Sequence, residues 1–245
     1  MVKKLETNFK RIEKKYIVDK EDLDRLLEDL REYLVEDDFP NSSITNIYFD
    51  TEDFQVIRDS IAKKNEREKI RMRTYATDPK PSSQVFLELK KKDAQGIGHK
   101  FRLATNLGDI QKFMGNGDTV HVPSENKQLV DELSQLRDKY QGLDARMYIF
   151  YNRFSLKEKH TIKKQPQTKI RITIDQNLTY RDYDVDILSG VYGNKLVGEG
   201  KVVMEIKTPG EQPLWLKTIL EKHGIEPKSF SKYGTAYRKS QGILQ

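Results

Sequence analysis

Residues 68–75 read EKIRMRTY, and residues 84–91 read QVFLELKK. Apolar and charged side chains alternate in both stretches, and successive side chains of a β-strand point to opposite faces of a sheet. Arg71 and Arg73 therefore share one face of the first stretch, while the apolar residues beside them share the other. This alternation predicts two neighbouring strands, each with one apolar face and one charged face.

The same alternation recurs along most of the chain. Further strands are expected over residues 11–18, 44–50, 99–105, 147–157, 168–175 and 202–207, with a hairpin over 180–187 and 191–198. Apolar spacings of three and four predict helices over 20–34, from Ser124 to Tyr140 and over 211–223, with shorter ones near 108–114 and after Ser231. We expect a single α+β domain over residues 1–245, a barrel or tunnel of about eight antiparallel strands with helices packed outside.

Composition excludes several classes of protein. The chain contains no cysteine, which excludes disulfides, thiolate metal sites and thiol nucleophiles. Its longest apolar runs fall far short of the ~18 residues typical of a membrane span, and its amino terminus lacks the apolar region of a secretory signal. We therefore expect a cytoplasmic protein without a membrane segment of its own, which leaves room for a membrane partner. The 44 Lys and Arg against 38 Asp and Glu give a net charge of +6, which weakly indicates an anionic partner.

The charged strand faces indicate what that anion is. A sheet with one solvated face is the simpler explanation of the alternation. However, seven segments repeat Arg or Lys, and the amphipathic helices can cover the apolar faces, which would turn the charged faces inward. Roughly nine cations inside a barrel would repel one another strongly unless an anion is bound. We expect a linear polyanion such as polyphosphate or a nucleoside triphosphate, because Arg and Lys both bind phosphate oxygens.

The alternation also selects candidate site residues. The candidates for binding phosphate are Lys15, Arg71, Arg73, Lys90, Lys100, Arg102, Tyr151, Arg153, Arg171 and Lys207. Glu13, Glu88 and Glu205 lie on the same faces and are candidates for holding Mg²⁺ or Mn²⁺, since both ions prefer oxygen ligands.

An ordered series of motifs resembles the VTC domain, the polyphosphate polymerase domain of the vacuolar transporter chaperone complex and its stand-alone bacterial relatives. The series is Arg11-x-Glu13-x-Lys15-Tyr16, Ile47-Tyr48-Phe49-Asp50-Thr51, Arg71-x-Arg73, Phe86-Leu87-Glu88-Leu89-Lys90, Lys100-x-Arg102, Tyr151-Asn152-Arg153, Glu205-Ile206-Lys207 and Phe230-Ser231-Lys232-Tyr233. The family belongs to the triphosphate tunnel metalloenzymes, also called CYTH proteins. The resemblance extends from about Lys10 to Arg238.

This resemblance implies an eight-stranded tunnel that binds triphosphate with Mg²⁺ or Mn²⁺ and moves the γ-phosphate of ATP onto a growing polyphosphate chain. The basic catalytic residues that it implies are Lys15, Arg71, Arg73, Lys90, Lys100, Arg153, Arg171 and Lys232, with Glu205 as the metal carboxylate. Hydrolases and cyclases of the superfamily open with Glu-x-Glu-x-Lys, whereas this chain has Arg11 in place of the first glutamate. That difference favours the polymerase branch.

Other functions stay open at this stage. A tripolyphosphatase or nucleoside triphosphatase needs the same phosphate-binding residues, and so does a non-catalytic module that binds polyphosphate or a nucleotide. Binding of nucleic acid is not expected, because the charged faces offer few aromatic side chains beyond Tyr151 for stacking. The four histidines lack metal-ligand spacing, and the charge runs at 63–69 and 157–164 are expected to be solvated or to attract an anion.

Overall fold

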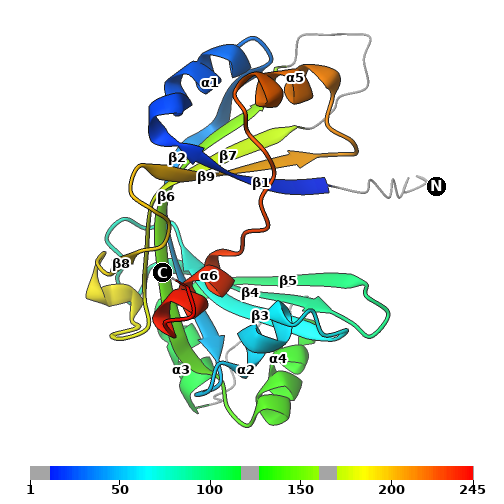
Figure 1. The fold of residues 1–245 in the computed structure, drawn as a ribbon. Coiled ribbons are helices and arrows are strands. Elements are labelled where there is room, and N and C mark those ends of the chain that lie inside the picture. The colour runs from blue at the N-terminus through cyan, green and yellow to red at the C-terminus, as the bar shows by residue number, and fades with distance from the viewer. Residues whose placement is uncertain (1–11, 117–126, 160–169, 245) are drawn as a thin grey trace, which may run out of the picture. The chain divides into compact units, whose positions relative to one another are not determined.

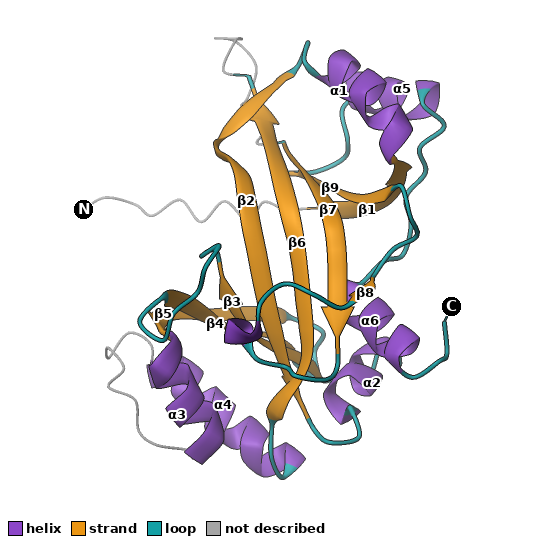
Figure 2. Ribbon diagram, turned by 90° about the vertical axis from the view of Figure 1, so that its left-hand side faces the viewer, coloured by secondary structure: helices purple, strands orange, loops and turns teal. Residues whose placement is uncertain are grey.

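A computed structural model describes residues 12–116, 127–159 and 170–244. In these residues the chain forms a mostly antiparallel nine-stranded sheet and six α-helices, which confirms the expected α+β class (Figures 1 and 2). No helix in the described ranges is both long enough and apolar enough to cross a membrane.

The strands follow the predicted alternation closely but do not close into a barrel. They are β1 (Ile12–Asp19), β2 (Leu34–Asp50), β3 (Arg67–Thr74), β4 (Gln84–Lys92), β5 (Gly98–Asn106), β6 (Asp144–Glu158), β7 (Arg171–Arg181), β8 (Asn194–Lys195) and β9 (Lys201–Thr208). The order is β1-β9-β7-β6-β2-β3-β4-β5, with β8 paired to β7. Within the described residues no ladder joins β1 to β5, so the expected closure was wrong. Alternation specifies which side chains share a face, but closure depends on strand tilt and stagger.

The helices are α1 (Leu23–Leu30), α2 (Gln55–Ile61), α3 (Leu107–Asn116), α4 (Lys127–Tyr140), α5 (Leu214–Lys222) and α6 (Lys232–Ser240). The helix expected over 20–34 is shorter, because Leu34 starts β2 and its buried side chain joins the same apolar cluster from a strand. Helix α2 was not predicted. Near its start, the backbone N–H groups of Val56 and Ile57 donate to the buried carboxylate of Asp50.

The chain divides into two compact units. Unit 1 comprises Met1–Ser42, Asn152–Asn177 and Val197–Phe230, and unit 2 comprises Ser43–Tyr151, Leu178–Leu196 and Ser231–Gln245. In unit 1, α1 and α5 pack against the apolar face of β1, β7 and β9. In unit 2, α3 and α4 cover the apolar face of β3, β4 and β5. Helices therefore cover the apolar strand faces in each unit, as expected.

The hairpin expected over 180–187 and 191–198 forms only in part, because β8 pairs antiparallel with the end of β7 but both paired segments are shorter than predicted. Strand β7 ends at Arg181, and residues 182–193 form a loop around its fully buried side chain. The Arg181 guanidinium donates to the backbone oxygens of Asp184, Asp186, Gly190 and Tyr192 and lies between the rings of Tyr148 and Tyr192. Because the Arg181 guanidinium donates hydrogen bonds to four loop carbonyls, residues 182–193 are ordered without a second long strand.

Candidate functional site

The charged face of unit 2 is built by the ladders of β2, β3, β4 and β5. Cross-strand pairing places its side chains in three rows: Asn46, Arg73, Phe86 and Ala104; Tyr48, Arg71, Glu88 and Arg102; and Lys69, Lys90 and Lys100. Five of the predicted cations therefore lie on one face of one unit. The apolar side chains between them, such as Ile70 and Leu87, point to the helix-covered face.

Glu88 lies among these cations and is only 3% exposed. Its carboxylate accepts from Arg71 Nε at 2.7 Å and lies 3.8 Å from Lys100 Nζ and 3.7 Å from Arg102 Nε. Burial alone would raise the pKa of Glu88, but the charges of Arg71 and Arg73 and the hydrogen bond from Arg71 lower it overall. Glu88 therefore stays ionised at neutral pH and offsets part of the positive charge.

Arg73 is held on this face by hydrogen bonds to uncharged partners. Its Nε donates to Asn46 Oδ1 at 2.9 Å, and its Nη2 donates to Tyr151 Oη at 3.0 Å. Lys232, the first residue of α6, places its Nζ 4.7 Å from the centre of the Tyr151 ring. Tyr233, the next residue, donates to Asp50 at 2.7 Å and anchors the helix. Tyr151 thus brings together two cations that lie 159 positions apart in sequence (232 minus 73).

The charged face of unit 1 is built by β1, β9 and β7. Pairing places Lys15, Glu205 and Thr173 in one row across β1, β9 and β7, and Glu13, Lys207 and Arg171 in another. Lys15 Nζ contacts Glu13 at 2.7 Å and Glu205 at 4.0 Å, and Lys207 forms ion pairs with both glutamates. Burial raises the pKa of Glu205, but the charge of Lys207 and its hydrogen bond lower it overall.

Two further acids hold the remaining arginines of unit 1. Asp175 is fully buried and receives two hydrogen bonds from Arg153, Nε to Oδ1 at 2.7 Å and Nη2 to Oδ2 at 2.9 Å. Arg171 Nε lies 2.9 Å from Asp37 Oδ2. Sequence reasoning did not assign a role to either acid. Strand alternation does place Asp175 on the charged face, whereas Asp37 gives no such signal because β2 begins ten residues earlier than predicted (34 against 44).

The charged faces are consequently less positive than the sequence suggested. Glu88 in unit 2, and Glu13 and Glu205 in unit 1, each contact more than one cation, so the chain itself neutralises part of the positive charge on these faces.

In the part of the chain that the structure describes, no group of three or more His, Asp or Glu side chains is arranged to hold a metal ion. Glu13 and Glu205 nevertheless lie on neighbouring strands and share Lys15 and Lys207 as partners. Mg²⁺ is commonly held by one or two carboxylates together with substrate phosphates, so these two glutamates have the oxygen ligands that such an ion prefers.

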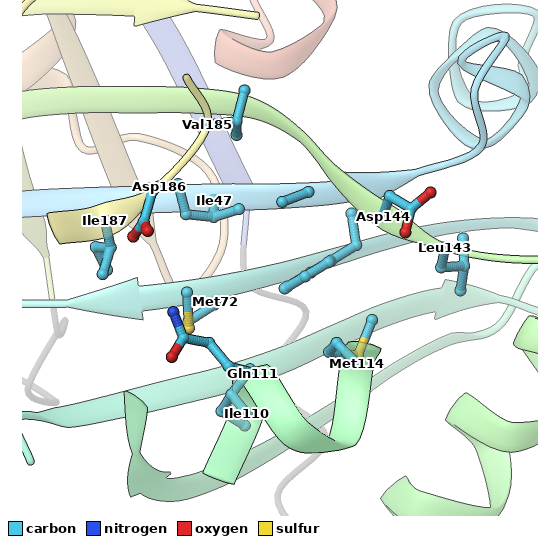
Figure 3. Close-up of a pocket in the computed structure, with 12 residues that line it drawn as sticks. Ile47, Met72, Ile110, Gln111, Met114, Leu143, Asp144, Val185, Asp186 and Ile187 are labelled. Carbon is cyan, nitrogen blue, oxygen red and sulfur yellow. The ribbon is translucent and has the colours of Figure 1, made fainter. Parts of the chain in front are cut away.

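Unit 2 contains a cavity of about 220 Å³, and Figure 3 draws the residues that line it. Ile47, Met72 and Ile110 line it, with Val185 and Ile187 from the loop around Arg181. Ile47 and Met72 belong to the helix-covered face of their strands, opposite Arg71 and Arg73. The cavity is therefore not part of the charged face.

The two described histidines each contact one aspartate, and the charge run at 63–69 is solvated only in part, because Glu68 is buried and accepts from Lys139 and Tyr140 of α4. His99 contacts Asp93 and His223 contacts Asp29, both at 2.8 Å. His121 and His160 lie outside the described residues, as do residues 160–164 of the second charge run. In the first run, Lys64 forms an ion pair with Asp59 at 2.8 Å.

The sequence from residue 10 to residue 241 matches the VTC domain. The chain belongs to the VTC domain family. This match confirms the resemblance drawn from the motif series and extends over nearly the whole VTC-domain chain. No curated protein matches it.

Two solved structures are similar to this VTC-domain chain. One is a Bacillus halodurans protein described as a candidate adenylate cyclase, with a TM-score of 0.51 and 16% identity over 90% of this chain and 93% of that one. The other, also described as a candidate adenylate cyclase, is from Vibrio parahaemolyticus, with a TM-score of 0.45 and 13% identity over 92% and 96%. At this identity the first likeness shows a shared fold and nothing about activity. The second likeness is too distant to carry an argument.

Proposed function

We propose that this VTC-domain chain transfers the γ-phosphate of ATP to a growing inorganic polyphosphate chain. The observation that carries the proposal is the series of Arg and Lys at regular strand spacing on the charged face of each unit. A row of cations at such spacing suits a linear chain of phosphates better than a single phosphate. Membership of the VTC domain family supports the same substrate class.

Phosphoryl transfer between phosphates needs little covalent chemistry from the protein. A terminal oxygen of polyphosphate attacks the γ-phosphorus of ATP, the bond from that phosphorus to the β-bridging oxygen breaks, and ADP leaves. The attacking oxygen is already ionised at neutral pH, so no general base is required. Catalysis then rests on positioning and on neutralising charge on the phosphate oxygens. Arginine and lysine side chains can do both.

The proposed roles follow from position and charge. Arg71 and Arg73 in unit 2, and Arg153 in unit 1, are half-buried or buried guanidiniums whose orientation is fixed by neighbours, which suits them to hold phosphate oxygens. The other phosphate-binding residues in this proposal are Lys15, Lys90, Lys100, Arg102, Tyr151, Arg171, Lys207 and Lys232.

Glu205 and Glu13 would hold Mn²⁺ or Mg²⁺ in this proposal. A bound divalent ion supplies additional positive charge to the phosphate oxygens during transfer. Beside Glu205, the buried Thr173 hydroxyl has no hydrogen-bond partner among the described residues. Glu88 as a metal ligand stays a prediction. Its three cationic contacts favour a role in holding Arg71, Lys100 and Arg102 instead.

The test is incubation with ATP and Mn²⁺, followed by separation of the products by chain length. Long polyphosphate chains together with ADP would support the polymerase. Free phosphate alone would assign the tripolyphosphatase or nucleoside triphosphatase alternative. Binding without turnover would leave a module that binds polyphosphate or a nucleotide. We place the reaction in the cytoplasm, where ATP would be its donor.

A further inference from the structure

Tyr75 and Phe86 lie on the charged face of unit 2 together with Tyr48, whereas the sequence suggested few aromatic side chains there. Phe86 is the Cα partner of Arg73 in the β3–β4 ladder, so it shares the face of Glu88 and Lys90. Tyr75 follows the end of β3 and is 42% exposed. The two rings meet edge to face, with their centres 5.8 Å apart.

Two arginines fix the orientation of these rings. The guanidinium carbon of Arg102 lies 3.8 Å from the centre of the Phe86 ring, within the range of a cation–π contact. Arg73 Nη1 lies 3.4 Å from the Tyr75 hydroxyl oxygen. Burial would raise the pKa of Tyr75, but the nearby charge of Arg73 lowers it overall, which agrees with this close contact. Arg73 therefore links the aromatic pair to the phosphate-binding cations.

We propose that Tyr75, Phe86 and Arg102 form a subsite that stacks the base of a nucleoside triphosphate. The inference rests on the proposed function, because it takes the neighbouring cations to bind the triphosphate. A nucleobase is flat and uncharged, and such rings stack on tyrosine and on arginine planes. Inorganic polyphosphate has no apolar surface and gains nothing from an exposed aromatic ring.

The surroundings of the rings agree with this assignment. The Arg102 side chain is 41% exposed although one side of its guanidinium lies against Phe86, and Tyr75 is similarly exposed. The Tyr75 ring and the Arg102 guanidinium are thus two partly exposed flat surfaces on this face. Arg73, which contacts Tyr75, is only 7% exposed and is fixed by Asn46 and Tyr151. A nucleotide consists of a base and a phosphate chain joined by one ribose. In this proposal Tyr75 and Arg102 contact the base, and the neighbouring Arg73 binds the phosphate chain.

The experiment compares two ligands, ATP and inorganic tripolyphosphate, by calorimetric titration with Mg²⁺ present and ionic strength matched. We expect Tyr75→Leu to raise the Kd for ATP by about tenfold, the size of one lost stacking contact, and to leave the Kd for tripolyphosphate unchanged. Tyr75→Phe keeps the ring and should bind ATP like the wild type. Tyr183→Leu removes a tyrosine that is 53% exposed on the loop around Arg181, so it is the matched control and should change neither Kd.

The subsite is overturned if Tyr75→Leu weakens both ligands equally, because Tyr75 would then act on phosphate through Arg73. It is also overturned if neither ligand is affected, since the rings would then only pack on one another. Tighter binding of a short oligothymidylate than of ATP, lost in Tyr75→Leu, would assign the rings to single-stranded nucleic acid. If the wild type fails to bind tripolyphosphate but binds ATP in a Tyr75-dependent way, the proposed function fails and the base subsite stands.

Discussion

Individual carboxylates, more than individual cations, distinguish the charged faces from ordinary solvated strands. Glu88, Asp175 and Glu205 are each less than a tenth exposed, and each contacts at least one arginine or lysine. A buried carboxylate without a cation would be strongly unfavourable. These three acids therefore hold cations in fixed places. We expect replacement of Glu205 to affect metal-dependent turnover and replacement of Glu88 to affect stability.

Glu205→Gln should nearly abolish metal-dependent turnover and leave the fold intact, because it keeps the side-chain volume and removes the charge that a divalent ion requires. The measurement is the rate of polyphosphate formation against Mn²⁺ concentration, with far-ultraviolet circular dichroism as the check on folding. Glu211→Gln, at a side chain that is 89% exposed, is the matched control. Full activity of Glu205→Gln at ordinary Mn²⁺ concentration would contradict the metal assignment.

Glu88→Gln should destabilise the chain by about 3 kcal/mol at neutral pH, because it leaves Arg71 without its buried partner. The pKa of Glu88 is lowered from its usual 4.5 in the folded chain. A carboxyl of this kind contributes stability that is fully present above pH 4.5 and is lost as the pH falls through the folded pKa.

The difference in unfolding free energy between wild type and Glu88→Gln should therefore be constant from pH 6 to pH 8, above the titration of an ordinary carboxyl at about 4.3, and should shrink below that value. Urea unfolding at several pH values measures it. A difference that stays constant down to the acid limit would show that Glu88 is not the titrating group.

At the scale of elements, alternation predicted which side chains share a strand face, and the ladders agree for β1, β3, β4 and β9. The alternation of apolar and charged residues does not indicate the order of the strands in the sheet or whether the sheet closes into a barrel. The open sheet could therefore not be predicted. Helix α2 was missed because it is short and is ordered by Asp50 rather than by a long apolar stripe. Likewise, nothing in the local sequence around Arg181 indicates that its side chain holds a loop where the two strands were expected to continue.

The register of β1 gives a direct test of face assignment. Lys15 lies on the charged face with Glu13 and Glu205, whereas Lys14 is the partner of Ile206 and lies on the opposite face. Lys15→Ala should weaken tripolyphosphate binding and Lys14→Ala should not, because a shift of one residue reverses the face. Isothermal titration of both variants measures this. Equal losses would mean that the phosphate site does not lie on this face.

The loop around Arg181 depends on one glycine. Gly193 has a φ of +136°, and a Cβ at this position would lie 2.4 Å from the backbone oxygen of Tyr180. Gly193→Ala should therefore lower the melting temperature clearly, since backbone has to move. Gly210→Ala is the matched control, because a Cβ there meets nothing within 4 Å. Calorimetric melting curves compare the two, and equal melting temperatures would show that the loop adapts without cost.

At the scale of the whole molecule, we propose that residues 1–245 act as one domain, because β2, β6 and β7 each contribute residues to both units. The candidate site could be predicted as a set of cations, since strand alternation exposes it. Glu13, Glu88 and Glu205 were predicted with it, but the roles of Asp37 and Asp175 were not, because their partners Arg171 and Arg153 lie on other strands. The contact between Tyr75 and Phe86 was not predicted either, because it depends on the pairing of β3 with β4.

Tripolyphosphate should stabilise the chain much more than orthophosphate does at matched ionic strength. The internal carboxylates already offset part of the cationic repulsion, so the gain comes mainly from contacts of one ligand with several rows of Arg and Lys. A ligand that binds only the folded state at a hundredfold excess over its Kd adds about 2.7 kcal/mol. For a chain of this length that corresponds to a melting shift of roughly 5–10 °C. Single phosphate ions cannot bridge successive rows, so differential scanning fluorimetry should show a much smaller shift for them. Equal shifts for both ligands would mean that the rows of cations act as separate, solvated charges and do not form a linear phosphate site.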